Sequence, residues 1–216
     1  SRKEQQDFAI SSHSKANSAR EAKMFDNEIV SIKNNDEIII KDGGIRPNTS
    51  HEILDGLKLV FDKNGTVTAG TASPLTDGAS AVIVCEEEYA KKNNLNILAR
   101  IKSTAVVGCP PELMGLGPIN ASKKALQRAN LSISDIDIVE LNEAFASQSL
   151  ACIKELNMDI NKVNIHGGAI ALGHPLGATG ARITGKVANL LQNNNKKYGL
   201  ATQCIGLGQG IATVLE

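Results

Sequence analysis

Three short stretches carry the side chains of this chain that are best suited to chemistry. Asn142 follows an apolar stretch. His174 lies between the flexible Gly173 and the rigid Pro175, and Cys204 precedes a turn containing Gly206 and Gly208. A thiol can act as a nucleophile or as an acid and base, and an imidazole transfers protons near neutral pH. Carboxamides and free backbone N–H groups stabilise a negatively charged oxygen. Together these groups are suited to acyl transfer.

Each of these residues also has a purely structural explanation. Asn142 is placed to cap a following helix, His174 to bond loop carbonyl groups, and Cys204 to fill a buried strand position. A metal site at His174 is not expected, because no second histidine or carboxylate lies at ligand spacing. Arg46 is either a solvated side chain or a contact for a phosphate or a flat base.

The elements that must position these residues alternate between strand and helix from residue 77 onward. This alternation predicts an α/β fold with a mostly parallel sheet and an antiparallel edge. Ligands bind such sheets beyond the carboxyl ends of the strands, so the three stretches should share one rim. The strands are predicted over 79–85, 98–107, 136–141, 163–165 and a hairpin of 200–204 with 211–215, and the helices over 86–93, 118–129, 143–156 and 178–191.

Residues 1–76 follow a different pattern. An Ala- and Ser-rich stretch over 5–25 has apolar residues at helical spacing, and 37–40 is strand-like. Thr49 and Glu52 form a capping-box pattern, and an apolar helical face is predicted from there to Phe61. Helices without a series of strands indicate an insertion or lid rather than a complete domain.

The composition excludes several classes of protein. Lys and Arg number 23, as do Asp and Glu, so the net charge of 0 argues against binding of nucleic acid. Hydrophobic residues make up 42%, which argues against disorder. No apolar run approaches the ~20 residues that cross a bilayer, and no signal peptide is apparent. The four cysteines match neither a zinc nor a CxxC pattern, which predicts reduced thiols and a cytoplasmic location.

The three stretches resemble the C-terminal signatures of the thiolase family. They read NEAFA at 142–146, GGAIALGHP at 167–175 and CIGLG at 204–208, and the family's pattern also covers 67–73 and 114–118. The resemblance runs over essentially the whole chain, in order. It implies a layered fold of two similar α/β halves with a loop domain over the site.

The resemblance also implies a reaction and no tightly bound cofactor. Acetyl-CoA C-acetyltransferases and 3-ketoacyl-CoA thiolases transfer an acyl group from coenzyme A to a nucleophilic cysteine. A second acetyl-CoA then loses a proton from its methyl carbon and attacks, which is a Claisen condensation to acetoacetyl-CoA in the simplest case. Thiolysis is the reverse. The substrates are acyl-CoA and acetyl-CoA, and full-length relatives form dimers or tetramers, so we expect a homo-oligomer.

The resemblance assigns roles to individual residues. Cys204 matches the acid/base cysteine, which works as a base only if its neighbours lower the pKa of its thiol. His174 matches the histidine that activates the nucleophilic thiol, Asn142 holds an oxyanion-binding water, and Gly206 lends its N–H to a second oxyanion hole. Ser73 and Arg46 match residues that contact coenzyme A, and Met114 and Phe145 match residues that line the acyl pocket.

The chain departs from the family's pattern in two ways. Single residues differ around the site, at Leu207, Thr71, Pro74 and Ile53. The larger departure is that no residue matches the nucleophilic cysteine, since Cys85 and Cys109 lie in other contexts. We therefore expect only the C-terminal portion of a thiolase, with the N-terminal half absent.

The expected domains follow from this reading. Residues 1–76 would be the C-terminal part of the loop domain, 77–97 the last elements of the N-terminal domain, and 98–216 the C-terminal domain. Three functions stay open. The chain is part of a thiolase that is inactive without its N-terminal half, a non-catalytic module that binds coenzyme A or lipid, or one half of a split thiolase.

Overall fold

A four-stranded sheet organises the computed structural model, which describes all 216 residues. The strand order is β3-β6-β5-β4. β3 (Ile101–Gly108) and β5 (Gly199–Ile205) both pair antiparallel with β6 (Gln209–Leu215), and β4 (Ile138–Leu141) pairs parallel with β5. The α/β class is confirmed, but the predicted preponderance of parallel pairing is wrong. The reason is that β6 returns between β3 and β5 and makes both of those pairs antiparallel.

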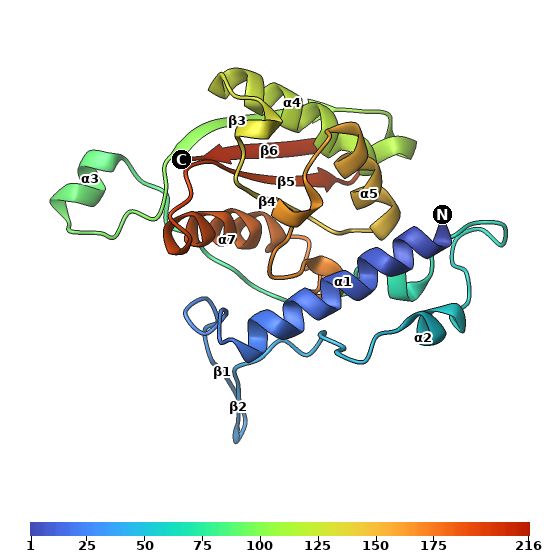
Figure 1. The fold of residues 1–216 in the computed structure, drawn as a ribbon. Coiled ribbons are helices and arrows are strands. Elements are labelled where there is room, and N and C mark those ends of the chain that lie inside the picture. Colours follow the sequence, from blue (N-terminus) through green and yellow to red (C-terminus); the bar gives the residue numbers. More distant parts are fainter.

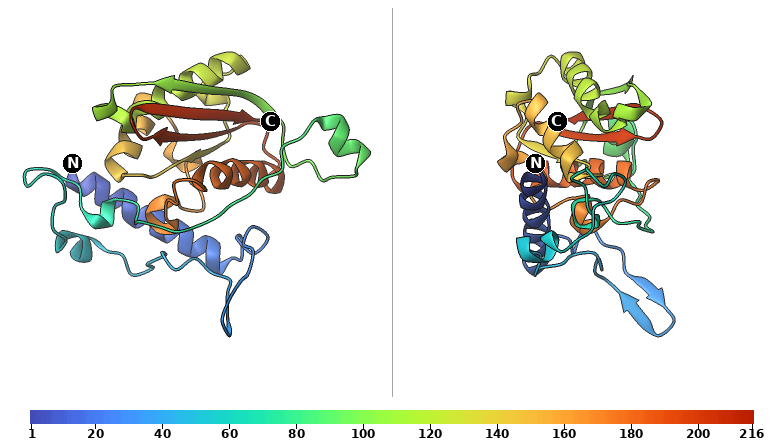
Figure 2. Two further views of the ribbon diagram at one scale, coloured as in Figure 1. Left: turned by 180° about the vertical axis from the view of Figure 1, so that it is seen from behind. Right: turned by 90° about the vertical axis from the view of Figure 1, so that its right-hand side faces the viewer.

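Helices cover both faces of this sheet (Figures 1 and 2). α4 (Gly117–Ala129) and α5 (Ala146–Glu155) lie on one face, over a core that includes Leu126, Leu141 and Leu200. α7 (Thr179–Asn193) lies on the other face, over a smaller core. Apolar residues recur along α7 at helical spacing and point at the sheet, which is why this stretch forms an amphipathic helix. The predicted strand over 163–165 is wrong, since only an isolated parallel bridge joins Val163 to Val139.

The first 76 residues wrap around this layered unit. α1 (Arg2–Glu21) begins with a capping box between Ser1 and Glu4, buries a stripe of small residues and lies against α6 (Ala169–Leu172). The exposed hairpin of β1 (Ile32–Asn34) and β2 (Glu37–Ile39) projects away from the body (Figure 1).

α2 (His51–Asp55) is shorter than the sequence predicts and starts one residue later. Its cap is Ser50, whose hydroxyl accepts a hydrogen bond from the backbone N–H of Ile53. Thr49, the predicted cap, instead donates its hydroxyl to the carbonyl of Arg46. Gly56 follows the last helical residue, so the helical face predicted to run on to Phe61 does not form. The remaining short helix at this end is a 3₁₀ turn, Ala69–Thr71.

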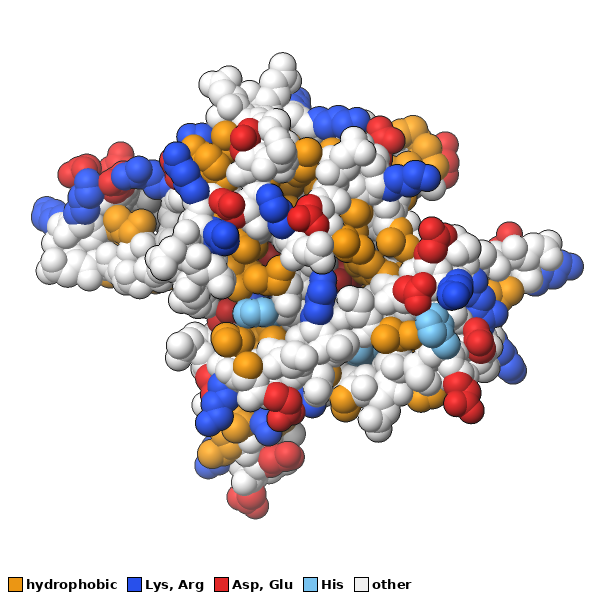
Figure 3. Space-filling model, viewed as in Figure 1, with side chains coloured by type: hydrophobic (Ala, Val, Ile, Leu, Met, Phe, Trp, Pro, Cys, Tyr) orange, Lys and Arg blue, Asp and Glu red, His pale blue; other side chains and the backbone are white.

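Residues 79–85 run extended but pair with no strand, so the strand predicted there is wrong. Val82, Ile83 and Val84 are 44%, 86% and 68% exposed. A strand needs a neighbour to take up its backbone groups, and no strand of this chain lies along the segment. The segment leads into a projecting lobe that carries α3 (Glu87–Lys92) and is covered with charges of both signs (Figures 1 and 3).

Three further 3₁₀ turns complete the chain, at Pro111–Leu116, Ile133–Asp135 and Ile160–Lys162. None of the helices is both long and apolar enough to cross a membrane.

Candidate active site

The structure brings Asn142 into direct contact with His174. Asn142 follows the last residue of β4, and its backbone N–H donates to the carbonyl of Thr202 at 2.9 Å, which continues the pairing with β5. Its side chain is buried, and Nδ2 donates to Nε2 of His174 at 3.2 Å. The next helix, α5, begins at Ala146 with Phe145 as its cap. Asn142 is therefore not a helix cap, and its carboxamide faces the histidine.

His174 is held from two other sides. Its Nδ1 lies 2.7 Å from the hydroxyl of Thr179, and its backbone N–H donates to the hydroxyl of Thr76 at 3.3 Å. Gly173 has φ = 94°, and a Cβ there would lie 2.6 Å from side-chain atoms of Thr76, so this position requires glycine. Burial, and after it the charge of Arg182, lowers the pKa of His174. The imidazole is therefore neutral at pH 7 and able to accept a proton.

Cys204 lies near the end of β5, where its Cα pairs with that of Gly210 in β6. The side chain is buried, and burial raises the pKa of its thiol. This is opposite in direction to the lowering that a base requires. As the structure stands, Cys204 holds its proton at neutral pH and can donate it. It becomes a base only after another group removes that proton.

The turn after Cys204 leaves space for a ligand. No atom lies within 4 Å of the position that a Cβ would take at Gly206. Leu207 has φ = 67° and Gly208 φ = 93°, so the turn uses left-handed backbone at two successive residues. The carbonyl of Gly208 accepts the backbone N–H of Cys109 at 2.8 Å, which fixes the far side of the turn.

The sheet register places Asn142 and Cys204 at one edge. β4 and β5 run parallel, with Leu141 opposite Thr202. Asn142 lies one residue after this pair and Cys204 two residues after it, so both lie at the same edge of the sheet. His174 reaches Asn142 from the loop that precedes α7. The arrangement offers a neutral imidazole, a protonated thiol and a carboxamide oxygen, Oδ1 of Asn142, that is buried without a partner.

Two of the four residues predicted to contact coenzyme A or the acyl group adjoin this edge. The backbone N–H and the hydroxyl of Ser73 both donate to the carbonyl of Ala144, at 3.0 and 3.2 Å. Ala72 forms a β-bridge with Phe145, which is half-buried. The segment around Ser73 therefore runs beside the residues that follow Asn142.

The other two lie in more peripheral elements. Arg46 is exposed, its guanidinium makes no ion pair, and its backbone N–H donates to Nδ1 of His13 at 3.1 Å. Met114 is half-buried in the 3₁₀ turn Pro111–Leu116, beside the start of α4.

Sequence reasoning missed Phe61 and Thr179. Phe61 is 86% exposed with φ = 68°, and its ring meets that of Phe145 edge-on with centroids 6.0 Å apart. The turn residues Asn64 and Gly65 that follow were a signal that a helix could not include Phe61. Nothing in the sequence marked Thr179 beyond its place five residues after His174.

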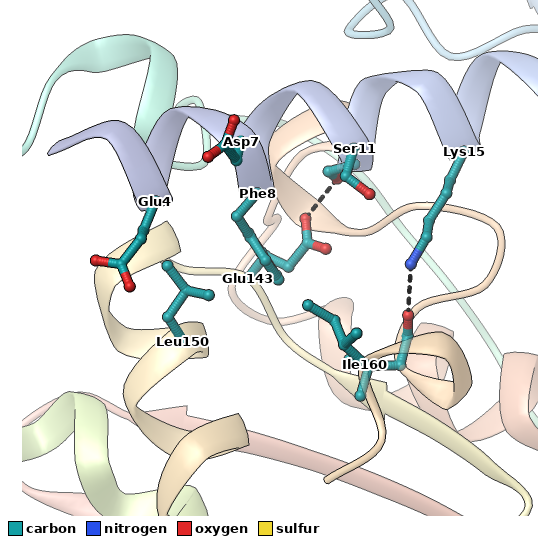
Figure 4. A pocket seen from close by; sticks show the side chains of 10 residues that line it. Glu4, Asp7, Phe8, Ser11, Lys15, Glu143, Leu150 and Ile160 are labelled. Carbon is teal, nitrogen blue, oxygen red and sulfur yellow. Dashed lines mark hydrogen bonds between the residues drawn. The ribbon is translucent and has the colours of Figure 1, made fainter. Parts of the chain in front are cut away.

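A separate cavity of about 230 Å³ lies between α1 and α5 (Figure 4), and polar or charged residues outnumber hydrophobic ones in its lining. Hydrophobic side chains are exposed on the face of the molecule shown in Figure 3. Neither Cys204 nor His174 lines it. At its floor, the buried carboxylate of Glu143 accepts hydrogen bonds from the hydroxyl of Ser12 at 2.6 Å and from Asn164 at 2.8 Å. Burial raises the pKa of Glu143. These bonds tie α1 to the residue that directly follows Asn142, which is a structural role.

The side chains present do not form a metal centre. No group of three or more His, Cys, Asp or Glu residues is arranged to hold a metal ion. All four cysteines are free thiols.

Comparison with known protein families matches the chain to two family models. Residues 95–216 match the model described as "Thiolase, C-terminal domain", and residues 1–88 match "Thiolase, N-terminal domain". The second match corrects the expectation that the chain holds the C-terminal portion only, because sequence belonging to the N-terminal domain model is also present.

The chain is similar in sequence to part of several longer proteins. The chain is 55% identical over 224 residues to the 3-ketoacyl-CoA thiolase of Shewanella loihica and 52% identical over 225 residues to that of Vibrio vulnificus. In each case 100% of this chain aligns with 58% of the relative. The chain thus spans little more than half the length of the curated relatives it matches.

Solved structures agree with this likeness. Human mitochondrial 3-ketoacyl-CoA thiolase in complex with CoA superposes with a TM-score of 0.97 at 46% identity, covering 100% of this chain and 54% of that one. The Bacillus anthracis acetyl-CoA acetyltransferase superposes with a TM-score of 0.95 at 43% identity, covering 56% of that chain.

Proposed function

The chain belongs to the thiolase family, and on that premise we propose that it supplies the acid/base and oxyanion-binding part of a 3-ketoacyl-CoA thiolase. Members of this family are acyltransferases that use coenzyme A thioesters without a tightly bound cofactor. The observation that carries the proposal is the 3.2 Å contact between Asn142 and His174. A loop histidine with a purely structural role does not require a hydrogen bond from a buried carboxamide that lies at the end of a strand.

The proposed chemistry assigns one task to each group. The neutral imidazole of His174 removes the proton from a nucleophilic thiol, which then attacks the thioester of an acyl-CoA. One oxyanion hole is formed by a water molecule that Asn142 holds, together with His174, and the N–H of Gly206 contributes to a second oxyanion hole. Cys204 gives its proton to the thiolate of the coenzyme A that leaves the first thioester, and then takes the α-proton of the second acetyl-CoA.

The raised pKa of Cys204 sets the order of these steps. Because burial keeps the thiol protonated, Cys204 first acts as an acid and gives its proton to the thiolate of departing coenzyme A. The resulting Cys204 thiolate, which is disfavoured by its buried setting, is then a strong enough base for a carbon acid. Substrates are held in the proposal by contacts to Ser73, Arg46, Met114 and Phe145.

We further propose the domain limits 1–76, 77–97 and 98–216, for the loop domain, the end of the N-terminal domain and the C-terminal domain. The partner proposed for this chain is the rest of the N-terminal domain, which carries the nucleophilic cysteine in the family. It would pair with the extended apolar segment 79–85, whose side chains are exposed here. A homo-oligomer of the assembled protein and a cytoplasmic location complete the proposal, the latter supported by four free thiols.

The test is a thiolysis assay with acetoacetyl-CoA. This chain is produced alone, and also together with the remaining 42% of the Shewanella loihica relative, the part that it does not match. The proposal expects thiolysis from the pair and none from this chain alone. It also expects no stable label on the chain alone after incubation with radioactive acetyl-CoA. Stable label on the isolated chain would contradict the assignment of roles.

A second candidate is a non-catalytic module that binds coenzyme A or lipid. Tight calorimetric binding of coenzyme A by the chain alone, together with an inactive pair, would favour it. The close approach of Asn142 and His174 weighs against this candidate, because binding of a nucleotide requires neither group.

A further inference from the structure

We propose that Thr179 is a positioning residue that fixes the tautomer of His174, with the proton on Nδ1 and the free lone pair on Nε2. Thr179 is the first residue of α7 and is fully buried. Its hydroxyl lies 2.7 Å from Nδ1 of His174 and 3.0 Å from the carbonyl oxygen of Pro175. Which ring nitrogen of a histidine carries the proton is decided by such partners.

The hydrogen bonds around the ring run in one direction. A threonine hydroxyl has a single proton, and the carbonyl of Pro175 can only accept, so the hydroxyl of Thr179 donates to it. The lone pairs of the same oxygen then accept the Nδ1–H of His174. On the opposite side of the ring, Nε2 accepts from Nδ2 of Asn142. Thr179 and His174 each donate once and accept once along this chain, which starts at the Asn142 amide and ends at the Pro175 carbonyl.

The reverse arrangement breaks these contacts. With the proton on Nε2, the ring and the Nδ2 amide of Asn142 would both present hydrogen atoms across 3.2 Å, and the amide would have to turn over. Thr179 would have to swing its proton from Pro175 to Nδ1. The backbone N–H of Thr179 also bonds the carbonyl of Pro175 at 3.0 Å, so the threonine is fixed where its oxygen can serve the ring.

The consequence for the reaction rests on the proposed function. Nε2 has one lone pair, so a thiol that approaches His174 takes the place of the Asn142 amide at this nitrogen, and its proton then moves from sulfur to Nε2. The products are a thiolate and an imidazolium ion, and the proton on Nδ1 stays where it is. Thr179 and the carbonyl of Pro175 then stabilise the positive charge through the same two hydrogen bonds. With the other tautomer, the nitrogen facing the thiol could not accept a proton.

The tautomer can be measured in this chain without any turnover. Two-bond ¹⁵N–¹H correlation spectra distinguish a protonated from an unprotonated ring nitrogen, and the variant His174→Gln identifies the signals of His174 among the four histidines. The spectra are compared for the unchanged chain, Thr179→Val and Thr179→Ser. Valine has nearly the shape of threonine but no hydroxyl, whereas serine keeps the hydroxyl.

A second buried threonine provides the matched control. Thr202 is also buried in this half, accepts a hydrogen bond from Ser122 and donates to the carbonyl of Ile211 at 2.8 Å. Thr202→Val therefore removes a comparable pair of hydrogen bonds from the core without touching the ring. It should lower stability as Thr179→Val does and leave the His174 spectrum unchanged.

We expect the Nδ1–H form in the unchanged chain and in Thr179→Ser, and a loss of this preference in Thr179→Val. In the pair that carries out thiolysis, Thr179→Val should lower kcat about 10- to 100-fold with little change in KM, and Thr179→Ser should restore it. An Nε2–H signal in the unchanged chain would overturn the proposal, as would an unaltered tautomer in a folded Thr179→Val. If the valine variant does not fold, the unchanged chain and the serine variant still decide. An inactive pair would count against the proposed function and leave the tautomer result standing.

Discussion

Two stretches of this chain, 79–85 and β4, are both rich in apolar residues, but one is exposed and unpaired and the other is a buried, paired strand. β4 reads Ile-Val-Glu-Leu, and all four residues are buried between the α5 and α7 faces. Segment 79–85 reads Ala-Ser-Ala-Val-Ile-Val-Cys and is extended, unpaired and exposed. The difference lies in the neighbours. β4 pairs with β5, which the same chain supplies, whereas 79–85 has no partner strand within the chain.

The comparison separates what forms the candidate site from what completes it. Asn142, directly after β4, is positioned by contacts that lie within this chain. Segment 79–85, which precedes the lobe carrying α3, makes no hydrogen bond to Asn142 or His174. It is joined to the start of α7 by the hydroxyl of Ser80, which donates to the carbonyl of Ala178. The residues proposed as the acid/base half of the site are therefore held by contacts within this chain, and the exposed segment is the surface proposed to receive the rest.

The largest effect is expected at the end of β5. Cys204→Ala removes the proposed acid and base, so kcat for thiolysis by the assembled pair should fall by about 10²- to 10⁴-fold. Cys85→Ala, at the end of the exposed segment, is the matched control. Because Cys85 lies in the proposed assembly surface, kcat is measured with the N-terminal part in saturating amount, where it should be unchanged. Equal kcat values for the two variants would show that the buried half does not carry the chemistry.

Deletion of buried side-chain volume in β4 should cost the most stability. Leu141 is 1% exposed, and Leu141→Ala should lower the free energy of unfolding by about 2–5 kcal/mol in denaturant titrations of this chain. A cost below about 1 kcal/mol would mean that β4 is not packed as the structure has it.

The buried carboxyl of β4 should make stability depend on pH. Burial raises the pKa of Glu140 from 4.5 to about 7, so between these values the folded chain binds more protons than the unfolded chain. The free energy of unfolding should therefore fall as the pH rises through this window, by up to about 3 kcal/mol from this group. Denaturant titrations at several pH values measure the slope, and Glu140→Gln should flatten it. An equal slope in both proteins would contradict the assignment.

The smallest effect on this chain, and the sharpest contrast with β4, is expected in the exposed segment. Ile83→Asn should change the free energy of unfolding by less than about 0.5 kcal/mol, because the side chain is 86% exposed. The same variant should weaken co-purification with the N-terminal part of the Shewanella relative, since it places a polar group in the proposed interface. A large loss of stability without loss of assembly would reverse the comparison.

Much of this fold follows from local pattern, and the failures share one cause. The sequence predicted the three helices on the sheet to within three residues at each end, because their apolar spacing and turn residues are local signals. It failed at 79–85 and 163–165, where apolar residues were present but a partner strand was not. The hairpin of β5 with β6 is confirmed, but the place of β6 between β3 and β5, instead of at an edge, depends on tertiary pairing and was not predicted. Strand formation is decided by partners that periodicity does not report.

The candidate site shows the same division. Motif spacing pointed to Asn142, His174 and Cys204, and the structure joins the first two directly. The sequence could not reveal Thr179 or Phe61. The contact of the Thr179 hydroxyl with the His174 ring and the edge-on contact of Phe61 with Phe145 arise only from folding. Nor could it give the direction of the Cys204 pKa, which burial decides.

The most direct test of the central claim follows the α-proton itself. Acetyl-CoA is incubated in D₂O with the pair formed by this chain and the N-terminal part of the Shewanella relative, and deuterium in the methyl group is measured by mass spectrometry, for pairs that contain the unchanged chain, Cys204→Ala or Cys85→Ala. If Cys204, His174 and Asn142 act on one thioester, exchange should occur with the unchanged chain and with Cys85→Ala, and should fall to the background rate with Cys204→Ala. Equal exchange in all three proteins would contradict the account.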